Sequence, residues 1–154
     1  MARTPAREEK YRWVGPLLAD RIVMFQRRSD QKLYSTMIDA RNASSVGVTR
    51  DYPEHAYLLG EGFTNLKVVS TPEMMVRFLM NYRTPLIVGG GAVIADLAQH
   101  AGFQREQIKM TEIELFRVDL YIALSKDTSD SEVERWQQAL DRFKANAAYH
   151  ALLV

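Results

Sequence analysis

The sequence predicts an α/β fold in which helices cover both faces of a mostly parallel sheet, a three-layer sandwich. Short β-rich runs alternate with helical stretches, which is the pattern of α/β proteins. The repeated order of strand and helix is typical of parallel strands joined by crossover helices. The 154 residues suffice for one domain core, because a domain of this length buries roughly 70% of its unfolded surface.

Strand and helix signals follow one another from the Gly15-Pro16 break onward. Runs rich in β-branched and apolar residues predict strands at 21–25, 45–49 and 65–69. A helix is expected over 53–59, because Pro53 suits the first turn of a helix and Gly60 follows at its end.

Capping chemistry predicts the next helix. Ser70 and Glu73 have the spacing of a capping box, with Pro72 inside the first turn. One face of that helix is apolar and carries Met74, Met75, Phe78 and Leu79. The methionines of this helix are expected to fill the core rather than to bind a cofactor.

The second half of the chain continues the pattern. The apolar run 85–88 predicts a buried strand, and Gly89-Gly90-Gly91 leads into a helix over 92–101. Residues 111–116 and 118–124 form either two strands or one long bent strand. An amphipathic helix from about 130 to 147 carries Val133, Trp136, Leu140 and Phe143 on one stripe.

Composition excludes several classes of function. Twenty basic and nineteen acidic residues give a net charge of +1, which offers no basis for a nucleic-acid or membrane surface. The absence of cysteine excludes disulfides, thiol catalysis and zinc sites built on thiolates. His55, His100 and His150 lie on different expected helices and show no metal spacing. We therefore expect neither a metal nor a cofactor.

Four motifs occur in an order that resembles a known family. They are Thr4-Pro5-Ala6-Arg7 followed by residues 11–16, the strand-to-helix turn at 45–51, the returning strand at 120–128, and the helix at 133–140. In this order and spacing they are similar to the bacterial extracellular solute-binding proteins of family 3. These are the periplasmic, polar amino acid type of ABC-transporter substrate-binding protein, and the likeness covers nearly the whole chain.

The resemblance implies a fold of two α/β lobes that are joined by two hinge strands and close on a ligand. Residues 1–20 would then be a remnant of the first lobe with the outgoing hinge, and residues 21–117 the second lobe. Residues 118–154 would be the return hinge and a helix that normally packs on the first lobe. The chain is thus expected to be truncated. The apolar stripe of the last helix either folds back or meets another chain in a homodimer.

The resemblance also implies a role and a location. The chain would be part of the substrate-binding component of an ABC-type uptake system, with a membrane permease as partner. Its location would be the periplasm, although its Arg-rich first residues contain no signal peptide. Two alternatives remain open. One is an enzyme similar to the cyclohexadienyl dehydratases, and the other is a sensor or regulatory fragment without ligand.

The fold class predicts where a ligand binds. Ligands of open α/β sheets bind at the carboxyl ends of strands, where helices begin. The candidate residues there are Thr49, Arg50, Asp51, Tyr52, Ser70, Thr71, Gly89 and Gly90. Free backbone N–H groups and the helix dipole favour an anion at residues 49–52. Arg50 is the best candidate to contact an acidic ligand, whereas Asp51 either contacts the ligand or caps the helix.

Two further positions take their meaning from the resemblance. Arg7 matches the family arginine that grips a ligand carboxylate through two parallel hydrogen bonds, and the alternative is a solvated charge near a chain end. Gly89 and Pro85 stand where the family usually has aspartates, and the loss of a counter-charge for a buried ammonium argues against an ordinary α-amino acid. It also argues against the dehydratase alternative. The three glycines permit close backbone approach but match neither G-x-G-x-x-G nor a P-loop.

Overall fold

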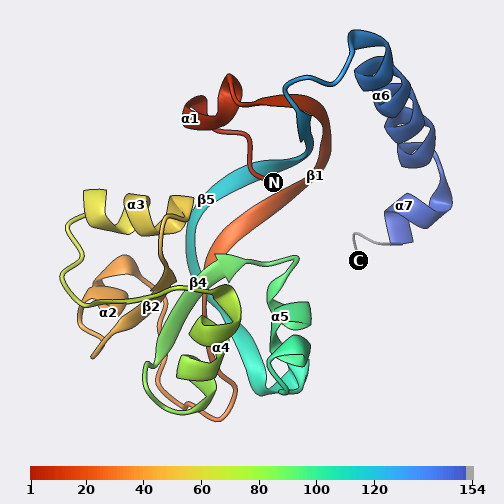
Figure 1. Cartoon of the computed structure of the whole chain (residues 1–154). Helices are drawn as coiled ribbons and strands as arrows, with labels where there is room; N and C mark the ends of the chain where they lie inside the picture. Colours follow the sequence, from red (N-terminus) through yellow and green to blue (C-terminus); the bar gives the residue numbers. More distant parts are fainter. Residues whose placement is uncertain (152–154) are drawn as a thin grey trace. The chain divides into compact units, whose positions relative to one another are not determined.

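The computed structural model describes residues 1–151, and the chain forms two compact units. Unit 1 comprises Met1–Asp20 and the chain from Arg117 onward, and unit 2 comprises Arg21–Phe116. Two long strands, β1 (Tyr11–Arg27) and β5 (Ile108–Ser125), belong partly to each unit, and they are neighbours in the sheet (Figure 1).

A five-stranded sheet forms the framework of unit 2. Its order is β3-β2-β4-β1-β5, where β2 is Val46–Thr49, β3 is Leu66–Val69 and β4 is Leu86–Gly90. Strand β2 pairs in parallel with both β3 and β4, whereas β1 pairs antiparallel with β4. The predicted α/β fold is confirmed, and its sheet is mixed. The strands that crossover helices join are parallel, and β1 enters the sheet without such a crossover.

Five short helical segments accompany this sheet. They are α2 (Met37–Arg41), α3 (Pro53–Gly60), α4 (Pro72–Met80), α5 (Ile94–His100) and the 3₁₀ turn η1 (Arg105–Gln107). Helix α2 was not expected from the sequence. Its signal is a short capping box, in which the Asp39 amide donates to Thr36 Oγ1 and the Thr36 amide donates to Asp39 Oδ2.

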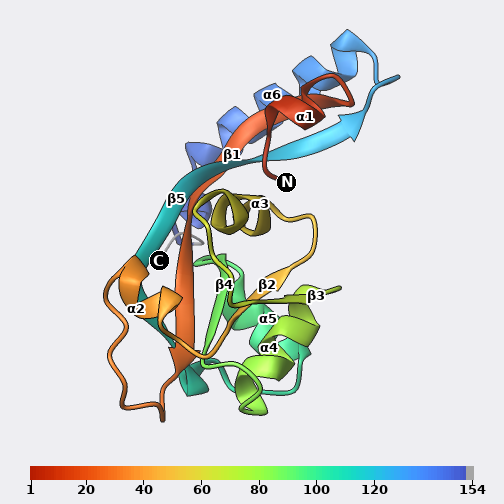
Figure 2. The ribbon, with the colours of Figure 1, turned by 90° about the vertical axis from the view of Figure 1, so that its left-hand side faces the viewer.

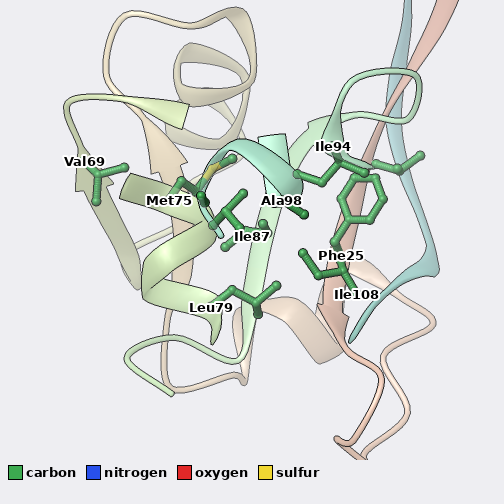
Figure 3. Close-up of a cluster of buried hydrophobic side chains, with 11 residues drawn as sticks. Phe25, Val69, Met75, Leu79, Ile87, Ile94, Ala98 and Ile108 are labelled. Carbon is green, nitrogen blue, oxygen red and sulfur yellow. The ribbon is translucent and has the colours of Figure 1, made fainter. Parts of the chain in front are cut away.

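The core of unit 2 lies on both faces of the sheet. On one face, Phe25 of β1 and Ile87 of β4 pack with buried residues of α4 and α5 (Figure 3). These two helices lie side by side in both views (Figures 1 and 2). The alternate strand residues Met24, Val46 and Val88 are also fully buried, and strand alternation points them to the opposite face. The sheet is therefore covered on both sides.

The expected break at Gly15-Pro16 is wrong, because β1 runs through it. Pro16 cannot donate a hydrogen bond, and the Gly15 amide finds its partner outside the sheet, at Oε1 of Gln137, 3.0 Å away. The peptide bond between these two residues is cis. Further along, the open choice between two strands and one is decided in favour of the single strand β5.

Unit 1 contains α1 (Pro5–Glu8), α6 (Asp130–Lys144) and α7 (Ala147–Ala151). The sequence predicted one helix over about 130–147, whereas α6 ends at Lys144 and α7, which was not expected, begins at Ala147. Asn146 separates them, because its side-chain oxygen accepts from the Ala148 amide at 3.0 Å and so caps a second helix. The hydroxyl of Tyr149 on α7 donates to the Leu17 carbonyl at 2.6 Å, which fastens α7 to β1.

The apolar stripe of α6 is only partly covered. Leu140 is buried, whereas Trp136 is 48% exposed and Phe143 is 40% exposed. The Phe143 ring packs edge-on against Tyr149, with ring centroids 5.7 Å apart. Among the described residues, no helix has the length and apolar character that a membrane span requires.

Candidate functional site

Three strands of unit 2 end at one edge of the sheet, which we call the carboxyl edge. It comprises the ends of β2, β3 and β4 and the residues that follow them, 49–52, 70–71 and 89–90. Thr49 pairs with Val69, and the Arg50 amide donates to the Val69 carbonyl at 2.9 Å. Because Gly47 pairs with Ile87 in a parallel register, Gly89 comes level with Thr49. The structure thus brings together eight of the nine predicted site residues.

Two of these residues face the core rather than solvent. Thr49 is 1% exposed, and its hydroxyl lies 3.8 Å from the Met75 sulfur. A Cβ on Gly89 would lie 3.8 Å from both Met75 and Ile94. Neither position presents a side chain to a solute at the edge.

The expected strand end at residue 88 is wrong. Gly89 and Gly90 are buried residues of β4, and they pair with Val23 and Ile22 of β1. The antiparallel partner strand extends β4 past the last apolar side chain, so the chain leaves the sheet only at Gly91. The backbone of these two glycines therefore takes part in the pairing of β4 with β1.

The turn between β2 and α3 offers fewer free amides than the sequence suggested. Asp51 has a φ of 62°, a left-handed conformation that Asp and Asn adopt more readily than most residues. The N-cap is Tyr52, without a side-chain cap, so the alternative in which Asp51 caps the helix is wrong. Pro53 has no N–H, and the Tyr52 amide donates to the Thr49 carbonyl at 3.4 Å.

Arg50 is the cation of this edge. Its side chain is exposed, and within residues 1–151 its guanidinium has no carboxylate partner. Its backbone position is fixed by the bond to Val69, so the side chain starts beside Ser70. An exposed guanidinium without a carboxylate partner in this range is a suitable receptor for a ligand carboxylate.

The start of α4 supplies those hydroxyl groups. The N-cap is Thr71, whose Oγ1 accepts from the Met74 amide at 3.2 Å, so the predicted capping box of Ser70 and Glu73 is wrong. Pro72 fixes the register, because it occupies the first helical position and leaves Met74 as the third. Ser70 is exposed, and among the described residues its hydroxyl has only the Met74 sulfur, 4.0 Å away, as an acceptor. It remains available to a ligand.

Sequence reasoning missed a buried acid at this edge. Glu54, in the first turn of α3, is 5% exposed, and burial raises the pKa of its carboxyl group. An acid in the first turn usually signals a solvated side chain near the positive end of the helix dipole. Nothing in the local pattern distinguishes this burial from that ordinary case. Two acidic residues, Asp51 and Glu54, thus lie at the start of α3, and one, Glu73, lies in the first turn of α4.

Arg7 belongs to unit 1. It lies in α1, half-buried, and its Nη1 donates to the Ala2 carbonyl at 3.3 Å. The described residues contain no group of three His, Asp or Glu side chains placed to hold a metal ion. His100 instead bonds the Asp96 carbonyl of its own helix at 2.8 Å.

The similarity of this chain to known proteins is found in their structures. No protein-family model and no curated protein matches the sequence. A solved amino acid ABC transporter substrate-binding protein from Streptococcus pneumoniae, bound to L-arginine, matches with a TM-score of 0.82 at 15% identity. That match covers 99% of this chain and 63% of the other. The fold is that of the periplasmic binding proteins.

Two further neighbours share this periplasmic-binding-protein fold. One is a histidine kinase sensor domain with similarity to periplasmic binding proteins (TM-score 0.76, 18% identity, 99% of this chain and 65% of that chain). The other is an ancestral amino-acid-binding protein described as a precursor of cyclohexadienyl dehydratase (TM-score 0.71, 17% identity, 99% and 63%). The chain thus spans less than two thirds of the length of the proteins it matches. The fold agrees with the resemblance seen in the sequence motifs.

Proposed function

We propose that this chain binds a small polar or anionic solute at the carboxyl edge of unit 2, as part of the substrate-binding component of an ABC-type uptake system. The observation that carries the proposal is Arg50, on a periplasmic-binding-protein fold: its backbone lies beside the segment that starts α4, and its exposed guanidinium has no partner among residues 1–151. The solute carboxylate accepts hydrogen bonds from Arg50 and from the hydroxyl groups of Ser70 and Thr71. Such charge-assisted bonds are about twice as strong as neutral ones.

The other predicted contacts take smaller parts in this proposal. The exposed Tyr52 side chain offers a ring and a hydroxyl group at the border of the edge. Arg7 stays a proposed carboxylate contact of unit 1, and it rests on the motif resemblance. Thr49 and Gly89 support the site from below, since both face the core.

The proposed role implies a location and partners for the chain. The periplasm is the proposed location and a membrane permease the proposed partner, supported by a neighbour described as an ABC transporter substrate-binding protein. A homodimer through α6 is proposed from the exposed Trp136 and Phe143. The neighbours are binding proteins and a sensor domain, which favours a non-enzymatic role. Sensing is the second candidate, supported by the histidine kinase sensor domain.

Calorimetric titration tests the proposal. The purified chain is titrated with L-arginine, L-glutamine, L-glutamate and succinate, and thermal shift is followed in parallel. Arg50→Gln is expected to weaken binding of the best solute at least about tenfold, because a lost charged contact costs roughly 1.4 kcal/mol or more. Arg77→Gln is the matched control, since it removes an exposed arginine of α4 outside the edge. Equal affinity of Arg50→Gln and the unaltered chain, or no binding in the whole panel, contradicts the proposal.

A further inference from the structure

A second concave surface of unit 2 lies along α5 and η1. It is a groove of about 450 Å³, bounded by α5 on one side and by the first residues of β5 on the other. A volume of this size lies within the usual range of pockets for small organic ligands, ~300–1,000 Å³. The proposed solute site at the carboxyl edge uses none of its side chains.

The floor of the groove is apolar. Phe25, Ile94, Ala98 and Ile108 line it, and all four belong to the core cluster shown in Figure 3. Small residues on the α5 side, Gly91 and Ala95, keep it open. A ligand with an apolar body would cover core side chains and displace water from them.

The rim of the groove is basic. Arg28, Arg105 and Lys109 line it, against one acidic residue, Glu106. Arg28 Nε donates to the Glu106 carbonyl at 2.6 Å, and Lys109 Nζ donates to the Asp30 carbonyl at 3.1 Å. These bonds hold the two cations in place without neutralising them, because neither has a carboxylate partner within the described chain.

The nearby carboxylates are engaged elsewhere or only weakly. The Asp30 carboxylate lies 3.7 Å from Arg27, and the Glu106 carboxylate lies 3.9 Å from Arg105. The groove therefore keeps a net positive rim above an apolar floor. This combination is complementary to a molecule that is negatively charged at one end and apolar at the other.

We propose that this groove is a second binding site, specific for a small organic anion with an apolar body. The carboxylate, sulfonate or phosphate end lies between Arg105 and Lys109, and the body lies on Phe25 and Ile108. This site is independent of the solute site at the carboxyl edge, so each can fail alone. Its occupant binds more weakly as salt rises, because the rim charges are exposed.

Two fluorescent probes with the same apolar body test the proposal on the full chain. One is 8-anilinonaphthalene-1-sulfonate, and the other is uncharged N-phenyl-1-naphthylamine. The sulfonate probe is expected to bind at least about tenfold more tightly than the neutral probe, which corresponds to ~1.4 kcal/mol. The double variant Arg105→Gln/Lys109→Gln is expected to remove most of that difference. Hexanoate is expected to displace the sulfonate probe, and acetate, which lacks the apolar body, is not.

A groove-filling variant separates this site from unspecific adsorption. Ala95→Leu places a larger side chain in the groove on a partly exposed helix position, where leucine suits the helix. This variant is expected to weaken binding of the sulfonate probe at least about fivefold, ~1 kcal/mol, with an unchanged midpoint of thermal unfolding. Arg77→Gln and Lys126→Gln, which remove basic residues elsewhere, are expected to leave the probe affinity within about twofold.

Three outcomes overturn the proposal. The first is equal affinity for the two probes, and the second is unchanged affinity in folded Ala95→Leu and Arg105→Gln/Lys109→Gln. The third is sedimentation with phosphatidylglycerol vesicles that depends on Arg105 and Lys109, because it assigns the rim to a membrane surface. Arg50→Gln reports on the other site only. It is expected to keep the sulfonate probe bound even if solute binding at the carboxyl edge is lost.

Discussion

Replacing Arg27 by methionine tests whether one buried cation holds the far end of unit 2 together. Arg27 is 8% exposed, and its Nη1 donates to the Leu79 carbonyl at 2.6 Å and to the Thr84 carbonyl at 2.9 Å. Its guanidinium also lies 4.4 Å from the ring of Tyr82 and 3.7 Å from the Asp30 carboxylate. This side chain therefore ties the end of β1 to the segment that connects α4 with β4.

The magnitude follows from these contacts. Each charged hydrogen bond contributes about 1.5–3 kcal/mol, and the ring contact adds ~0.5–2 kcal/mol. Burial of the guanidinium offsets part of this gain, and its Nε has no partner among the described residues. We expect Arg27→Met to lower the free energy of unfolding by about 3 kcal/mol, because the Thr84 carbonyl loses its donor and Asp30 its charged neighbour, whereas the Leu79 carbonyl keeps the Tyr82 amide. Arg27→Lys keeps the charge but not the planar guanidinium with its several N–H donors, so its loss in unfolding free energy is expected to be intermediate.

Urea unfolding followed by far-UV circular dichroism measures the change. With a slope of about 2 kcal/mol per M, the midpoint of Arg27→Met is expected to fall by roughly 1.5 M. Hydrogen exchange should show the lost protection first at residues 79–84. Arg77→Met, on the exposed side of α4, is the control and should stay within ~0.5 kcal/mol. A loss below ~1 kcal/mol with unchanged exchange at 79–84 refutes the reasoning.

Three further predictions concern single positions. Gly15→Ala is expected to destabilise unit 1 by about 1–3 kcal/mol, because a Cβ there would lie 2.5 Å from the Tyr121 ring. Gly60→Ala has open space around the new Cβ and should stabilise α3 by ~0.5–1 kcal/mol. Thermal unfolding compares the two variants, and equal effects would contradict the prediction. Thr71→Ala should lower the free energy of unfolding by about 1 kcal/mol and Ser70→Ala should hardly change it, since Thr71 is the N-cap of α4. The reverse order in urea unfolding would identify Ser70 as the N-cap instead. Glu54→Gln should stabilise the protein at pH 7. Burial raises the pKa of the Glu54 carboxyl group, so this group destabilises the folded state at any pH above its ordinary pKa of 4.5, where it is ionised in the unfolded chain. The stabilisation by glutamine should therefore vanish below that pH. An advantage of Glu54→Gln that persists unchanged at pH 3 would mean that ionisation is not its cause.

The order of elements in unit 2, apart from α2 and η1, could be predicted because it rests on local signals. The strands β2 and β3 and the helices between them follow β-branched runs, Pro in a first turn and Gly at an end, which act over a few residues. Boundaries failed where a distant partner decides them. Strand β4 extends to Gly90 because β1 pairs with it, and the ladder of β1 continues past Pro16 because Gln137 satisfies the neighbouring amide.

The candidate site shows the same division. Topology alone predicts that residues 49–52 and 70–71 meet, since parallel strands end at a common edge. The orientation of each side chain could not be predicted. Thr49 turns into the core toward Met75, and the cap of α4 shifts by one residue to Thr71, because Pro72 sets where the first helical turn begins.

The sequence by itself determined the α/β class, the succession of the main strands and helices, and the edge at which the strands end, because periodicity and turn chemistry are properties of neighbouring residues. Only the tertiary structure decided that Glu54 is buried, that the Arg50 guanidinium has no partner among residues 1–151, and that three cations surround an apolar groove. Burial and charge pairing depend on segments far apart in the chain, and residues 25, 95 and 109 become neighbours only when the sheet has formed.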